Sequence, residues 1–469
     1  MTTRAGQAGR EAELKRYREE LYGCFPRRRD ALFELCDALA TSGHLASPPP
    51  CHLSLGPSFT RGWGSAYGAL ARGRVDEAPL RRLLVGHRPR HWPKVFAVDT
   101  SSWPRCDAEC SPERGFYHHP SRHSAGKPVV AGWNYSWVSQ LCFDTSSWSA
   151  PVDVRRFPPT AGTTTATASQ VRDLVQLLEE QEAQDDDHDG GGSERPEVPL
   201  FVLDGGYDPA GLTDELGTTR AQVLVRVRAD RVFYRDPPPP IKGADGRPRR
   251  HGKRFCCAGP GTWGEPDATL STTDPRYGQV EVQSWAGLHP RLSRQGRWAK
   301  YKVAPVVRGT VLRVRVEHLP KSVASSGVTK ELWLWWAGPG SPDLDLCWQA
   351  YVHRFDIEHT LRFGKNTLGW TTPRVRSPEQ ADRWSLLVAA VYNELRLARG
   401  LVVDNRLPWE PPRDPAKLTP VRVRRGFWQL VHNLGTPAKP PKPTKAGPGR
   451  PKGSTRGPAT RYPPIKKAA

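Results

Sequence analysis

The segment YVHRFDIEHTLRFGK, residues 351–365, carries an acid, a tyrosine and several cations at helical spacing. Because each helical residue advances by about 100°, five side chains fall within an arc of roughly 80°: Tyr351, Arg354, Glu358, Arg362 and Lys365. Asp356 falls on nearly the opposite side. A metal-binding carboxylate flanked by cations suits a phosphodiester, whereas the alternative is a solvated face with ion pairs such as Glu358 with Arg362.

A single helix is predicted to carry this stripe. Ser341 is expected to cap its N-terminus, Pro342 to take the first helical position, and Asp343 and Asp345 to favour the first turn. The helical pattern then continues to about Phe363. The stripe is therefore expected to be continuous.

Two further acids stand where apolar strands are predicted to end. The run KVFAVD ends on Asp99, and VPLFVLD ends on Asp204, with Gly205 and Gly206 supplying a tight turn. Taken singly, each is also explained as a turn acid at a strand end. Together with Glu358 they would form a carboxylate cluster, which needs cations. Hard carboxylate ligands select Mg²⁺, or Mn²⁺ in its place, and two such ions support phosphoryl transfer.

Composition favours a globular protein that binds a polyanion. The 469 residues are 37% hydrophobic and carry a formal net charge of +21, which suits nucleic acid. No apolar run has the length of a membrane span, and the first twenty residues lack a signal peptide, so a cytoplasmic protein is expected. The nine cysteines have no regular spacing. Cys106 and Cys110 precede three histidines, yet the spacing fits no common zinc finger, which favours reduced structural cysteines over a zinc site.

Two basic segments are candidates for DNA contact. In RLSRQGRWAKYK, residues 291–302, cations alternate with Trp298 and Tyr301, as in surfaces that hold a DNA backbone and stack on a base. A surface loop rich in arginine, with Trp298 buried, is the alternative. In the tail, GPGRPKGS places Arg450 in an arrangement similar to an AT-hook, and a generic polycationic tail is the alternative.

The predicted elements divide the chain into five parts. Residues 1–90 form a helical module that is either DNA-binding or a plain scaffold. Residues 91–230 supply the first part of an α/β core, in the order three strands, helix, strand, helix, strand, with a hairpin at Asn134 and Tyr135. A β-rich insertion, residues 231–342, contains Trp333 and Trp335 as core. Residues 343–410 complete the α/β core with the Glu358 helix, and residues 411–469 end in a basic, Pro-rich tail expected to be disordered.

The chain resembles the DDE transposases with an RNase H-like core. The signature of the insertion-sequence 4 group is Tyr, two residues, Arg, three residues, Glu, six residues, Lys, and it is matched by Tyr351, Arg354, Glu358 and Lys365. The blocks AVDTSSWPRCDAECSPER, AGWNYSWV, VLDGGYD, LWQAYVHRFDIEHTLRFGKNTLGW and SPEQADRW resemble the insertion-sequence 701 type. The implied fold is a mixed sheet flanked by helices, with a β-rich insertion before the last catalytic helix.

The resemblance also implies a function. Asp99, Asp204 and Glu358 would bind Mg²⁺, while Tyr351, Arg354 and Lys365 would hold the DNA backbone, with Arg362, Arg297, Trp298 and Arg450 as further candidate DNA contacts. The expected activity is cut-and-paste transposition, in which terminal inverted repeats are cleaved and the freed 3′-hydroxyl attacks target DNA. A homodimer on DNA, and association with the nucleoid, are expected. The alternatives are a catalytically inactive, transposase-derived DNA-binding protein and a hydrolytic endonuclease without strand transfer.

Overall fold

The computed structural model describes residues 4–123, 127–144, 146–189, 197–239, 249–319, 330–443, 451–455, 457–458 and 461–466. The chain forms two compact units. Unit 1 consists of Met1–His91, Thr100–Thr160 and Asp356–Ala469, and unit 2 consists of Trp92–Asp99 and Ala161–Phe355. Within the described residues, no helix combines the length and the apolar character that a membrane crossing requires.

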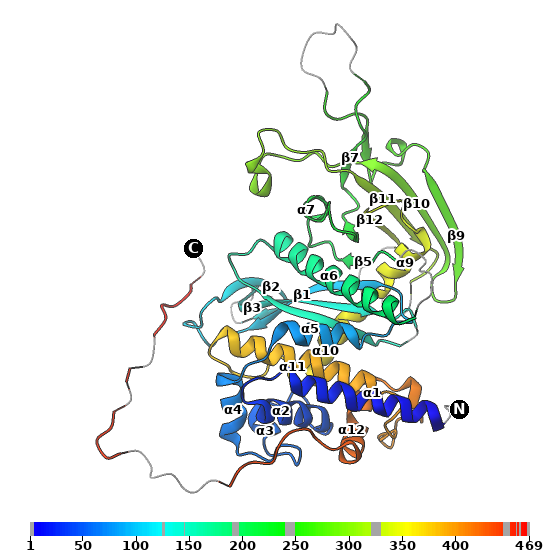
Figure 1. The fold of residues 1–469 in the computed structure, drawn as a ribbon. Helices are drawn as coiled ribbons and strands as arrows, with labels where there is room; N and C mark the ends of the chain where they lie inside the picture. The colour runs from blue at the N-terminus through cyan, green and yellow to red at the C-terminus, as the bar shows by residue number, and fades with distance from the viewer. Residues whose placement is uncertain are drawn as a thin grey trace. The chain divides into compact units, whose positions relative to one another are not determined.

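Unit 1 is built mainly from helices. Its helices are α1 (Arg4–Gly23), α2 (Arg29–Thr41), α3 (Pro50–Leu53), α4 (Trp63–Arg72), α5 (Glu77–Gly86), α10 (Asp356–Asn366), α11 (Pro378–Leu397) and α12 (Pro420–Leu434). Its strands are β2 (Gly115–His123), β3 (Lys127–Leu141) and β4 (Ser149–Phe157). Helix α11 is apolar and contacts β4 as well as α1 and α2 (Figure 1), so it forms the centre of this unit.

Unit 2 is built mainly from strands. Its strands are β5 (Leu200–Leu203), β6 (Gln222–Val227), β7 (Val232–Tyr234), β8 (Arg254–Cys256), β9 (Ala268–Asp274), β10 (Gly278–Leu288), β11 (Gly309–Val316) and β12 (Glu331–Ala337). Its helices are α6 (Thr163–Asp189), α7 (Pro209–Glu215) and α9 (Leu344–His353). Trp333 and Trp335 are buried in an apolar cluster with residues of β10 and of the short β7–β8 ribbon, which confirms that they are core.

The mixed sheet is described through strand β1 (Val95–Pro104), which has residues in both units. Its first half pairs in parallel with β5, and the order in unit 2 continues β5-β6-β12-β11-β10-β9. Beyond Asp99 the strand enters unit 1, where it neighbours β3, which also pairs with β2 and β4. This α/β architecture of a mixed sheet with flanking helices confirms the predicted fold class and is consistent with an RNase H-like fold.

The predicted hairpin at Asn134 and Tyr135 is wrong. Strand β3 runs without a break through both residues, and Asn134 pairs with Phe157 of β4. The side chains of Tyr135 and Trp137 are buried, so the aromatic residues extend one long strand instead of flanking a turn. Four strands therefore precede α6, and Asp204 follows the fifth strand of the chain instead of the fourth.

Candidate active site

Asp99 and Asp204 lie side by side in unit 2, where the pairing of the central strands β1 and β5 ends. The parallel register of β1 and β5 pairs Val95 with Leu200 and ends with Val98 opposite Leu203. Asp204 directly follows β5, whereas Asp99 lies inside β1, so the predicted strand end at Asp99 is wrong. Each acid is one residue beyond the last pair of the ladder, and neighbouring strands are about 4.8 Å apart. Both runs are apolar and fully buried, as in a parallel strand covered on both faces, whereas the two acids are half-buried. Solvent and ions can therefore reach this pair of carboxylates.

The turn after β5 orients the Asp204 carboxylate. Its Oδ1 atom accepts a hydrogen bond from the backbone N–H of Gly206 at 2.8 Å, which is the geometry of an Asx-turn. A Cβ atom at residue 206 would lie 3.1 Å from this same oxygen, so glycine permits the close approach. The turn thus fixes the direction in which the carboxylate points.

Tyr351 lies in the electrostatic neighbourhood of Arg354, Arg226 and Asp204. Burial raises the pKa of the Tyr351 phenol, the cations Arg354 and Arg226 lower it in part, and the Asp204 carboxylate raises it further. The phenol also shares a hydrogen bond with the Arg226 side chain. Tyr351 therefore stays protonated at neutral pH, and its hydroxyl can donate a hydrogen bond to an anionic oxygen.

Arg226 is a candidate site residue that sequence reasoning missed. Strand β6 pairs in parallel with β5, and Leu203 is opposite Val225, so Arg226 is the next residue after the pair, as Asp204 is on β5. The signal was present in the sequence, because QVLVRV alternates and Arg226 is the one cation in that strand. Continuing the parallel register by one residue beyond the apolar run would have found it.

The predicted single helix is two helices. Helix α9 ends at His353, and α10 begins at Asp356 after a turn at Arg354 and Phe355. Asp356 is favoured in a first turn and disfavoured in a helix interior, which agrees with a new start there. The N-cap of α9 is Asp343, not Ser341, because the Asp343 carboxylate accepts hydrogen bonds from two backbone N–H groups, both at 3.0 Å.

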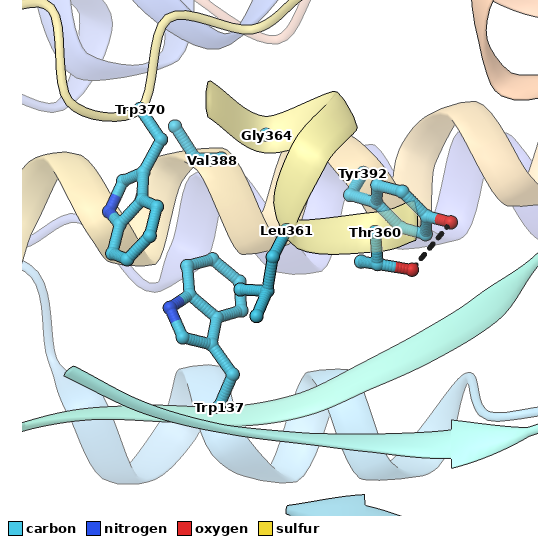
Figure 2. Close-up of a pocket in the computed structure, with 7 residues that line it drawn as sticks. All are labelled: Trp137, Thr360, Leu361, Gly364, Trp370, Val388 and Tyr392. Carbon is cyan, nitrogen blue, oxygen red and sulfur yellow. Dashed lines mark hydrogen bonds between the residues drawn. The ribbon is translucent and has the colours of Figure 1, made fainter. Parts of the chain in front are cut away.

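Helix α10, in unit 1, carries the second half of the stripe. Glu358, Arg362 and Lys365 are spaced four and three residues apart and share one face. The opposite face is buried, and Figure 2 shows Thr360 beside Tyr392 of α11 and Leu361 beside Trp137 of β3. The Thr360 hydroxyl lies 2.8 Å from that of Ser149 and 3.2 Å from that of Tyr392. The Lys365 ammonium is 5.7 Å from the centre of the Trp370 ring. These contacts fix the rotation of α10.

The structure therefore places the predicted residues in two groups. Asp99, Asp204, Tyr351 and Arg354 belong to unit 2, whereas Glu358, Arg362 and Lys365 belong to unit 1. Among the residues that the structure describes, no three His, Cys, Asp or Glu side chains are grouped so that they could hold a metal ion. Cys106 and Cys110 are exposed free thiols.

Of the two basic segments that are candidates for DNA contact, the structure describes residues 291–302 but not Arg450. Trp298 is 6% exposed and packs with Ala210 and Val307, and Arg297 lies over its ring while bonding to Glu215 at 2.6 Å. The indole is thus covered in this conformation, as in the alternative of a basic loop with a buried tryptophan. Arg450 lies outside the described residues.

Comparison with known proteins identifies a family. No curated protein matches the chain. A family model described as DDE superfamily endonuclease matches residues 20–291, a range that contains Asp99 and Asp204 and ends before α10. Because this match spans more than half of the 469 residues, the chain belongs to the DDE superfamily endonuclease family.

Proposed function

We propose that this protein is a DNA transposase of the insertion-sequence 4-like group, of the 701 type, which cleaves transposon ends and joins the 3′-hydroxyl to target DNA. The observation that carries the proposal is the end of the β1–β5 pairing, where Asp99 and Asp204 are the next residues after the last pair. Membership of an endonuclease family implies a DNA substrate, and the net charge of +21 suits one.

Asp99, Asp204 and Glu358 are proposed to hold two divalent ions. The donor set consists of hard carboxylate oxygens, which suit Mg²⁺ and accept Mn²⁺, and the strand-borne pair is half-buried and reachable. When bound, such ions supply an activated attacking oxygen and stabilise the leaving one. This chain's contribution is to orient the ligands: the Gly206 turn aims Asp204, and the packing of α10 aims Glu358.

The cations and the tyrosine are proposed to hold the DNA backbone. The protonated Tyr351 hydroxyl, held by Arg226, would donate to a phosphate oxygen near the cut, and Arg354 would neutralise its charge. On α10, Arg362 and Lys365 are proposed as further contacts to the DNA backbone. Arg297 and Trp298 would contact DNA only after leaving their packing on α7, and Arg450 would add affinity from the tail. Pairing of two ends implies a homodimer on DNA.

The test is Mg²⁺-dependent cleavage of DNA that carries the element's own ends. We expect Asp204→Asn and Glu358→Gln to lower the cleavage rate by at least about 10³-fold with DNA binding retained, since each removes a carboxylate that would hold the ions needed for the chemical step. Glu180→Gln, the same chemical change at an exposed position on α6, is the matched control. If Glu358→Gln cleaved DNA at the native rate, Glu358 would not be part of the active site.

A second function, hydrolytic cleavage without joining, is favoured by the family description, which names an endonuclease. Pre-cleaved ends with a free 3′-hydroxyl, incubated with target DNA and Mg²⁺, separate the two. Joined products support a transposase. Cleavage of intact ends without any joined product would replace the transposase with a nuclease, and binding without either reaction would indicate an inactive relative.

A further inference from the structure

The N-terminal helices of unit 1 expose an unusual combination of arginine and aromatic side chains. On α4, Trp63 is 67% exposed and Tyr67 is 37% exposed, with their rings 6.4 Å apart. The exposed side chains of Arg28 and Arg72 lie over Gly68, on the other side of α4 from the two rings. We call the arginine pair, Arg28 and Arg72, the α4 surface. It lies entirely in unit 1 and includes none of the residues assigned above to metal or DNA.

Two guanidinium groups converge on this surface. A Cβ atom added at Gly68 would lie 3.4 Å from Nη2 of Arg72 and 3.9 Å from Nη1 of Arg28, so both cations face the same point above α4. Within the described part of the chain, neither arginine forms an ion pair with a carboxylate. The nearest acids in sequence are already engaged, because Asp30 lies 3.5 Å from Arg61 and Asp76 lies 3.0 Å from Arg74.

This convergence has no evident structural benefit. A cation in the last turn of α4 offsets the negative end of the helix dipole, which explains Arg72 alone. A second cation at the same place adds like-charge repulsion instead. An anion bound between the two guanidinium groups would remove that repulsion, and each planar group offers paired N–H donors that match phosphate oxygens.

The backbone conformation of Arg28 also favours a function for its side chain. Arg28 precedes α2 with φ 58° and ψ 32°, the left-handed conformation that glycine adopts without strain and arginine does not. The chain thus keeps an arginine where glycine would stabilise the turn. A residue held at such a cost is often retained for a function of its side chain.

The partner that fits is the sugar–phosphate backbone of DNA. Converging guanidinium groups suit the phosphate oxygens of that backbone. The α4 surface offers the donors of two arginines but no asparagine or glutamine, so its contacts would carry charge more than sequence information. A protein or peptide partner would need acidic groups placed at this spacing, whereas every DNA segment has them.

We propose that the α4 surface is a second DNA-binding site, which holds the backbone independently of sequence and away from the carboxylates. The proposal rests on the proposed function in that DNA is the substrate. It makes a quantitative claim, because removing one arginine that neutralises a phosphate should make the dependence of log K on log salt shallower by about one unit.

The experiment measures DNA affinity of the full chain against salt concentration for Arg28→Gly, Arg72→Ala and the double variant. Arg16→Ala is the matched control, since Arg16 is an exposed arginine of α1 paired with Glu20 at 3.9 Å. We expect the salt slope of the double variant to be shallower by about two units, equally on end DNA and on scrambled DNA. Arg28→Gly should fold with a melting temperature no lower than the native chain, because it relieves the left-handed strain.

The outcomes separate this inference from the proposed function. If the double variant binds more weakly but cleaves saturating end DNA at the native rate, the α4 surface binds and does not catalyse, as proposed. An unchanged salt slope in a folded double variant would overturn the inference, whatever the native chain cleaves. A slope that falls only on end DNA would overturn its independence of sequence. Absence of cleavage by the native chain would count against the transposase assignment and leave the slope measurement valid.

Discussion

The two groups of proposed metal ligands are held in different ways. Asp99 and Asp204 are fixed by the backbone, because a ladder of four residue pairs sets their positions on β1 and β5. Glu358 is fixed by side chains, because α10 keeps its orientation by packing Thr360, Leu361 and Gly364 against β3 and α11 (Figure 2). Ladder hydrogen bonds persist when a side chain changes, whereas a packed helix responds to each neighbour.

Because of this difference, we expect the position of Glu358 to be more sensitive to mutation than the positions of Asp99 and Asp204. Helix α10 rests on α11, and α11 is anchored by a buried charge network in which Arg18 of α1 bonds to Asp37 of α2 and to Glu394 of α11. All three side chains are at most 4% exposed. Perturbing this network should loosen α10 while the strand-borne pair stays in place.

Removing the shared cation should have the largest effect. Arg18→Ala leaves two buried carboxylates without a counter-charge, and such a break costs about 3–5 kcal/mol of unfolding free energy. We expect this decrease in chemical denaturation, together with faster hydrogen exchange of the α10 and α11 amides. The amides of β5 and β6 should keep their native exchange rates.

The control for Arg18→Ala is Arg16→Ala, since Arg16 is on the same helix but exposed, and exposed pairs contribute at most about 1 kcal/mol. If the amides of β5 and β6 exchanged faster along with those of α10, the two regions would unfold as one, and the contrast between backbone and side-chain fixation would be wrong.

The same network predicts a pH dependence of stability. Burial raises the pKa of Glu394 to about 7, from 4.5, and raises that of Asp37 as well. Between these values the folded chain binds more protons than the unfolded chain, so the unfolding free energy should fall as pH rises from about 4.5 to about 7. We expect a change on the order of 1–3 kcal/mol between pH 5 and pH 7.5.

Urea denaturation of the native chain and of Glu394→Gln at both pH values tests whether Glu394 causes this pH dependence of stability. The glutamine cannot titrate, so the variant should show a weaker pH dependence over this window. A dependence as steep as in the native chain would assign it to other groups.

Sequence alone predicted the features that a repeating pattern determines. The apolar run before Asp204 predicted where β5 ends, whereas β1 continues past Asp99 and only its pairing with β5 ends there. The β-rich character predicted for residues 231–342 is matched by strands β10, β11 and β12. The turn at Arg354 and the unbroken course of β3 through Asn134 were not predicted, because tertiary packing decides them and local propensity does not. Arg226 was missed because its role depends on which strand lies next to β5.

The smallest expected effect is a gain in stability from a substitution at Gly364, which tests how the packing of α10 holds Glu358. A Cβ atom at Gly364 would lie 3.9 Å from Trp370 and from Val388, which is ordinary contact, and it would fill part of the small pocket beneath α10 (Figure 2). Since alanine also favours a helix interior over glycine, Gly364→Ala should raise the unfolding free energy by about 0.5–1 kcal/mol. Gly435→Ala, at a φ of 73° where alanine is strained, should change it in the opposite direction. Slower exchange confined to α10, with an unchanged cleavage rate, would mean that packing alone positions Glu358; a drop in cleavage would mean that α10 must move during the reaction.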